Sequence, residues 1–119
     1  MKYSNSFTHD LKFGELAETW VKDLFNGGLK IEVKSDRLAL KTGNIFIEVY
    51  SREKQSGISI TDADYWIYRF EQNDIAIIIP TNKLKELVKE YFTGSFTLGG
   101  DNNTSKGVLI PINKILQKH

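Results

Sequence analysis

The sequence contains no cysteine, only two prolines among 119 residues, and no long hydrophobic run. Without cysteine the protein forms neither disulfides nor thiolate metal sites, which fits a reducing compartment. The longest apolar run, residues 75–79, is far shorter than the roughly 20 residues that a helix needs to cross a bilayer. Residues 1–6 are polar and lack the apolar segment of a signal peptide. We therefore expect a soluble cytoplasmic protein, in the host cytoplasm if it is viral, with no membrane partner.

Net charge is also nearly absent. The 16 Lys and Arg residues are balanced by 15 Asp and Glu, which gives +1 at pH 7. A protein that binds nucleic acid usually carries a basic excess, because neutralising phosphates drives its affinity. A metal-dependent nuclease, however, devotes several carboxylates to its metal, so a near-neutral total is compatible with a basic groove. The length and the 40% hydrophobic content predict one globular domain over residues 1–119.

Hydrophobic periodicity predicts an α/β fold. Thr8 or Asp10 is expected to begin a first helix that runs to Phe25, where two glycines end it. Apolar and polar residues alternate over 29–34, and β-branched or aromatic residues fill 45–50, as is typical of strands. The remaining expected elements are a helix over 63–70, a central strand over 75–79, a helix ending at residue 92, an edge strand over 108–110 and a final helix over 112–118.

Three carboxylates stand out by their positions. Glu15 lies in the first predicted helix directly after a glycine, and Asp36 follows the first strand. Glu48 interrupts an apolar strand, where an uncompensated carboxylate is costly. Strand alternation places Glu48 on one face with the aromatic residues at positions 46 and 50. Oxygen ligands from separate elements suit Mg²⁺ or Mn²⁺; the alternative is a buried acid paired with Lys or Arg.

Glu15, Asp36 and the tripeptide Glu48-Val49-Tyr50, in the predicted order helix, three extended segments, helix, strand, resemble the core of the PD-(D/E)xK nucleases. The resemblance covers roughly residues 10–80 and implies a restriction-endonuclease-like core, a central mixed β-sheet flanked by helices in the order αβββαβ. The Gly14-Glu15 pair is similar to the helical motif of resolvase-type members. The resemblance implies that Asp36 and Glu48 hold Mg²⁺ or Mn²⁺ and that Glu15 holds it directly or through water.

The chain departs from this family at one position. The family lysine, two residues after the acid, is Tyr50 here. Three lysines are alternatives: Lys54 in the loop after the strand, Lys34 on the first strand and Lys22 two turns beyond Glu15. We expect Lys54 to serve, because the chain after the acid could fold it back.

The polar loop over residues 51–59 precedes the predicted helix at 63–70 and resembles the stretch after the acid in phage-type relatives. Arg52, Lys54 and Ser56, with Lys34, are expected to contact phosphates, because cations, hydroxyls and the N–H groups of a helix start bind anions. The alternative is a solvated connecting loop.

These features together predict a Mg²⁺- or Mn²⁺-dependent DNA endonuclease with Glu15, Asp36, Glu48 and Lys54 as its catalytic residues. One such site cuts one strand, so a duplex break or a resolved junction suggests a homodimer. Branched junctions, duplex ends and specific sequences are all open as substrates. The second hypothesis is a nuclease-fold module that has lost its lysine and only binds nucleic acid or protein. A third is an unrelated α/β protein with an apolar small-molecule pocket.

Overall fold

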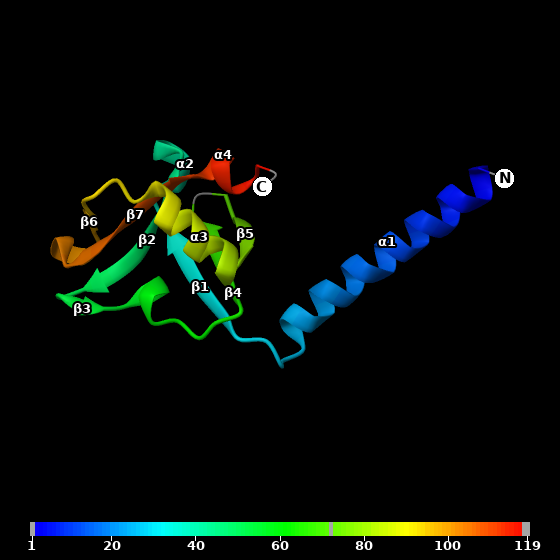
Figure 1. Ribbon diagram of the computed structural model, residues 1–119, viewed down its shortest axis with the longest axis horizontal. Helices are drawn as coiled ribbons and strands as arrows, with labels where there is room; N and C mark the ends of the chain where they lie inside the picture. Colours follow the sequence, from blue (N-terminus) through cyan, green and yellow to red (C-terminus); the bar gives the residue numbers. More distant parts are fainter. Residues whose placement is uncertain (1, 72, 118–119) are drawn as a thin grey trace. The chain divides into compact units, whose positions relative to one another are not determined.

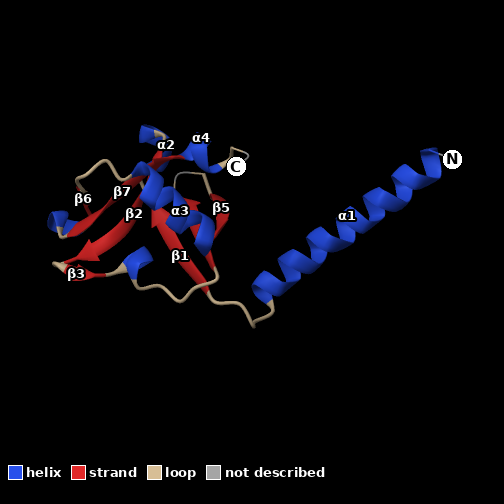
Figure 2. Ribbon diagram, viewed as in Figure 1, coloured by secondary structure: helices blue, strands red, loops and turns tan. Residues whose placement is uncertain are grey.

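A computed structural model describes residues 2–71 and 73–117, apart from the side chains of residues 2–10 and 101. The sequence predicted one domain, and the chain divides into two compact units, residues 1–30 and residues 31–119. Figures 1 and 2 show the elements of both units. No helix in the described part of the chain is long and apolar enough to cross a membrane.

The first unit consists of one long helix, α1 (Lys2–Phe25). It begins well before the residues that were expected to cap it. At its other end, the Asn26 N–H donates to the Lys22 carbonyl, and the glycines at 27 and 28 both have positive φ, so the predicted stop is confirmed. Many apolar side chains of α1 are exposed, with Leu16 at 69%. An amphipathic helix gains most of its stability by burying its apolar face.

The second unit contains a three-stranded mixed sheet in the order β1-β4-β5. Strand β1 (Ile31–Asp36) runs parallel to β4 (Tyr65–Phe70), and β4 runs antiparallel to β5 (Ile75–Pro80). The predicted strand at 75–79 is therefore confirmed, although it lies at an edge of its sheet and β4 takes the centre.

A four-stranded antiparallel sheet forms the other layer, in the order β3-β2-β7-β6. Its long members are β2 (Asn44–Ser51) and β7 (Ser105–Pro111); β3 (Lys54–Gln55) and β6 (Thr97–Gly99) are short edge strands. The predicted strand at 108–110 thus belongs to a longer strand that is paired on both sides. The register of β2 with β7 shifts between Glu48 and Tyr50, which is a β-bulge.

Helix α3 (Thr81–Tyr91), which the sequence predicted, packs against β5 of one sheet and β7 of the other (Figure 2). The shorter helices are α2 (Ala39–Thr42), η1 (Gly57–Ser59), η2 (Asp101–Asn103) and α4 (Ile112–Ile115). The buried core between these elements consists mainly of aliphatic and aromatic side chains: Ala39, Ile45, Ile47, Ile58, Trp66, Tyr68, Phe70, Ile79, Leu84, Leu87, Val108, Ile110 and Ile115. Burial of this apolar surface is the main force that holds the unit together.

The helix predicted over 63–70 is wrong, because this segment is strand β4. Its alternating burial is that of a strand: Trp66, Tyr68 and Phe70 are buried, and the residues between them are half-buried. Thr61, which was expected to cap the helix, accepts a hydrogen bond from the Ala63 N–H in a turn. Aromatic and β-branched residues fit a pleated, half-buried surface, and here that preference prevails over the apparent cap. The α/β class, with mixed and antiparallel sheets flanked by helices, is confirmed.

Candidate functional site

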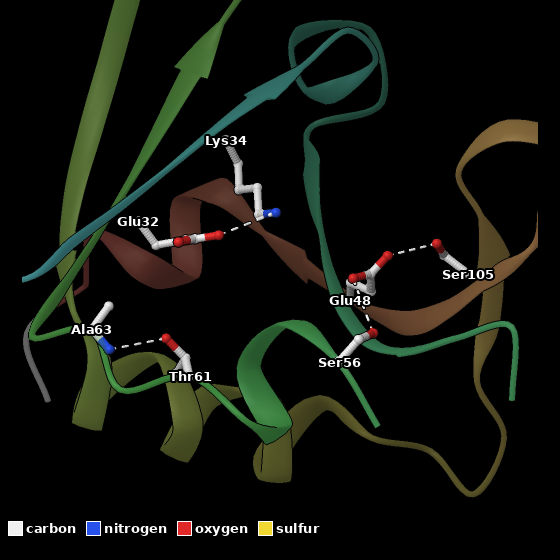
Figure 3. A network of polar contacts seen from close by, with 7 residues as sticks. All are labelled: Glu32, Lys34, Glu48, Ser56, Thr61, Ala63 and Ser105. Carbon is white, nitrogen blue, oxygen red and sulfur yellow. Dashed lines mark hydrogen bonds and ion pairs between the residues drawn. The ribbon is translucent and has the colours of Figure 1, made fainter. Parts of the chain in front are cut away.

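Glu48 lies in the middle of β2, and serine hydroxyls hold both of its carboxylate oxygens (Figure 3). The Ser105 hydroxyl, from β7, donates to Oε1 at 2.6 Å. The Ser56 hydroxyl, from the segment between β3 and η1, donates to Oε2 at 3.0 Å. These bonds satisfy an acid in a half-buried position without neutralising its charge. A pairing with Lys or Arg, the alternative to a metal ligand, is not among the contacts of Glu48 in the described residues.

Two glycines allow the backbone to approach Glu48 closely. A Cβ at Gly57 would collide with the Glu48 carbonyl oxygen, and Gly57 also has a positive φ. A Cβ at Gly107, the register partner of Glu48 on β7, would collide with the Ile47 carbonyl. Only glycine fits at these two places without displacing β2, so they fix the backbone that carries the acid.

The bulge turns Tyr50 away from Glu48. Glu48 pairs with Gly107 and Tyr50 pairs with Lys106, so Val49 has no register partner. Successive residues of β7 point to opposite faces of the sheet, and so do the residues paired with them. The prediction that Glu48 and Tyr50 share one face is therefore wrong. Tyr50 contacts the Phe96 ring edge-on, with the ring centres 5.4 Å apart.

On β1, three side chains alternate onto one face: Glu32, Lys34 and Asp36 are half-buried, and the residues between them are exposed. The Lys34 ammonium lies 3.4 Å from a Glu32 carboxylate oxygen and 5.9 Å from the centre of the Trp66 ring. Figure 3 shows this ammonium extending toward the part of the network where Glu48 lies.

Tyr68 on β4 carries a buried hydroxyl whose pKa responds to acids on β1 and β2. It is the register partner of Lys34 and is only 2% exposed. Burial raises the pKa of Tyr68 above its ordinary range. The negative charges of Asp36, Glu32 and Glu48 raise it further, in that order. Three carboxylates from two strands therefore act on one buried hydroxyl.

Asp36 uses its carboxylate to hold the backbone. One of its oxygens accepts hydrogen bonds from the N–H groups of Leu38 and Ala39, both at 2.9 Å, and the other accepts from Phe46 N–H at 3.3 Å. These bonds begin α2 and tie the end of β1 to β2. Both oxygens thus have structural partners.

The other predicted residues lie in two places. Glu15 is an exposed residue of α1, in the unit formed by residues 1–30, whereas Asp36 and Glu48 belong to the second unit. Arg52 and Lys54 are exposed at the β2–β3 hairpin, whose turn residues Arg52 and Glu53 both have positive φ. The hairpin holds Lys54 opposite Ser51. In the described part of the chain, no three His, Cys, Asp or Glu side chains form a group suited to hold a metal.

Sequence reasoning missed Glu32, Tyr68 and Ser105. Glu32 had a usable signal, because it alternates with Lys34 along the predicted strand over residues 29–34. Ser105 had none, since a serine in a loop-rich segment does not reveal that β7 brings it beside Glu48.

Comparison with known proteins yields no relative: no family model, no curated protein and no solved structure matches this chain.

Proposed function

We propose that this protein is a metal-dependent endonuclease that hydrolyses phosphodiester bonds in DNA, on a restriction-endonuclease-like variant of the α/β fold. One observation carries the proposal: Glu48 is a half-buried acid in the middle of an apolar strand, and both of its carboxylate oxygens are held by serine hydroxyls. A half-buried acid is costly to a fold, and such residues are often functional.

The chemistry of these donors fits a hard divalent cation. Glu48 and Glu32 offer carboxylate oxygens, which Mg²⁺ and Mn²⁺ prefer, and the serine hydroxyls on Glu48 can rotate to free its lone pairs. We assign the ion to Glu48 and Glu32, and Asp36 supports the site by tying the end of β1 to β2 through its backbone hydrogen bonds. When bound, such an ion activates water and neutralises charge on the phosphate.

We assign the role of the family lysine to Lys34 in place of Lys54. Lys34 is half-buried beside Glu32, whereas Lys54 is exposed on the hairpin. A half-buried ammonium next to the acids stabilises negative charge on a phosphate more strongly than an exposed one, because water screens it less. Arg52, Lys54 and Ser56 then contact neighbouring phosphates of the DNA backbone.

The test is cleavage of plasmid and branched DNA with Mg²⁺, Mn²⁺ or EDTA by wild type, Glu48→Gln, Glu32→Gln and Lys34→Met, with Glu86→Gln as an exposed control. Wild type and the control should cut only with metal, and the other three variants should not. Equal cutting by all five proteins would indicate a contaminating nuclease and remove the proposal.

A second candidate is a module that binds nucleic acid without cutting it. Two observations favour it: Tyr50 stands at the family's lysine position, and Lys34 already pairs with Glu32. This candidate predicts metal-independent DNA binding that survives Glu48→Gln, with no cleavage by wild type.

We also propose a homodimer, since one site of this kind cuts one strand and a break in a duplex requires two. The exposed apolar side chains of α1, among them Leu11, Leu16 and Val21, support a helix–helix contact between two copies. Light scattering after gel filtration should give twice the 13.6 kDa chain mass. Leu16→Glu should convert the dimer to a monomer, and a wild-type monomer at micromolar concentration would remove this part of the proposal.

A further inference from the structure

The face of the four-stranded sheet that carries Glu48 has a defined set of neighbours. Cross-strand partners share a face, and successive paired residues alternate between faces. The register therefore places Phe46 and Leu109 on this face at one side of Glu48, and Ser51 and Lys54 on it at the other side. We call these five residues the Glu48 face; Ser105, which pairs with Ser51 and bonds to Glu48, confirms the assignment.

The apolar end of the Glu48 face is built around a supported ring. The Phe46 ring lies against the backbone of Gly99 and Gly107, since a Cβ at either glycine would come within 2.7 Å of its Cζ atom. Phe46 is half-buried, and its register partner Leu109 is 40% exposed. One side of the ring thus packs on the sheet, and part of the ring meets solvent beside Leu109. A ring held in this way is a rigid stacking platform.

The opposite end of the Glu48 face is polar and cationic. Ser51 lies between Ser105 and Lys54 in the register of the three strands, and Lys54 is exposed. A serine hydroxyl and an ammonium are donors that suit a phosphate oxygen. The order along the face is therefore apolar platform, acid, phosphate donors.

We propose that the Glu48 face binds an unpaired nucleotide, with its base stacked on Phe46 beside Leu109 and its neighbouring phosphate on Lys54 and Ser51. We favour a nucleotide over a protein segment because the face offers a match for both parts of a nucleotide. The Lys54 ammonium suits the negatively charged phosphate, and the Phe46 ring suits the flat base. In an intact duplex each base is already stacked on both sides, so Phe46 reaches only a base at a single-stranded segment, a flap or a loop. The inference rests on the proposed function and narrows its substrate to DNA with unpaired bases.

The experiment measures binding in EDTA, where no cleavage is expected, by fluorescence anisotropy of a labelled oligothymidine and of a duplex of equal length. Wild type should bind the single strand more tightly than the duplex at the same salt concentration. Phe46→Leu keeps an apolar side chain over the glycines and removes the ring, so it should weaken single-strand binding by about 5- to 100-fold. Lys54→Gln should weaken it and lower the slope of log affinity against log salt by about 0.7.

The matched control is Phe92→Leu, which removes an exposed aromatic ring outside the Glu48 face and should leave binding unchanged. Thermal melts check that Phe46→Leu is folded. Single-strand binding by folded Phe46→Leu equal to wild type, or a wild-type preference for duplex, overturns the inference. If Phe46→Leu loses binding but no variant ever cuts DNA, the inference stands and the endonuclease proposal fails. If wild type cuts DNA and Phe46→Leu binds and cuts it equally well, the endonuclease proposal stands and the inference about Phe46 fails.

Discussion

The end of β1 and the middle of β2 each place a carboxylate near Tyr68, but they hold it differently. Asp36 accepts hydrogen bonds from three backbone N–H groups, whereas Glu48 accepts them from two serine hydroxyls. A backbone N–H is fixed by the fold and cannot turn away, whereas a hydroxyl rotates about one bond. The difference suggests that Asp36 stabilises the structure and that Glu48 remains available to a ligand.

The largest expected effect is on DNA cleavage, which should depend on the charge of Glu48. Glu48→Gln keeps the shape of the side chain and removes its charge, so DNA cleavage should fall by at least about 100-fold, while the free energy of unfolding changes little. Glu53→Gln, an exposed change on the same hairpin, is the control. Cleavage by Glu48→Gln at the wild-type rate would contradict the claim that Glu48 is the acid needed for activity.

The next effect is on the free energy of unfolding, which should depend on Asp36. Asp36→Ala leaves three backbone N–H groups without an acceptor, so the free energy of unfolding in urea should fall by about 2–3 kcal/mol. Asp36→Asn retains one acceptor oxygen and should lose about half as much. If Asp36→Asn is as stable as wild type but as inactive as Glu48→Gln, Asp36 is a ligand, as the sequence predicted, and the contrast between the acids disappears.

A smaller effect concerns the hydroxyls that orient Glu48. Ser105→Ala removes the shorter, buried hydrogen bond and should lower cleavage by about 10-fold, because groups that orient a metal ligand typically contribute 10- to 100-fold. Ser56→Ala removes the longer bond and should cost less. If Ser56→Ala lowered cleavage more than Ser105→Ala, Ser56 would be the main support of Glu48.

The smallest effect tests the burial of the Tyr68 hydroxyl. The pKa of Tyr68 is raised in the folded state, so the native protein keeps a proton that the unfolded chain releases near pH 10. The resulting stability is fully present below pH 10 and is lost as the pH rises. Wild type should therefore lose about 0.8 kcal/mol more than Tyr68→Phe between pH 8 and pH 10.5.

Parts of the fold could be read directly from the sequence. Residues 45–50 of β2 are nearly all β-branched or aromatic, α3 has a regular apolar stripe, and two glycines end α1, so local chemistry agreed with the final structure at each. Segment 63–70 failed because its cap-like Thr61 and Asp62 competed with the strand preference of the residues that follow, and tertiary packing of Trp66 and Tyr68 settled the outcome.

The site was harder to predict than the fold. Glu48 stood out because an acid inside an apolar strand is unusual in any context. Its hydrogen-bond partners, Ser56 and Ser105, lie 8 and 57 residues away along the chain. No local sequence pattern indicates that such distant residues meet Glu48. The bulge at Val49 was equally invisible, since it depends on how β7 pairs with β2.

Val49, the extra residue of the bulge, also limits how this chain could change over evolutionary time. A lysine introduced at position 50 would emerge on the side of the sheet opposite the acid, beside Phe96. The motif that the tripeptide resembles therefore cannot be restored by a single codon change, because an insertion or deletion must first bring the strand back into phase.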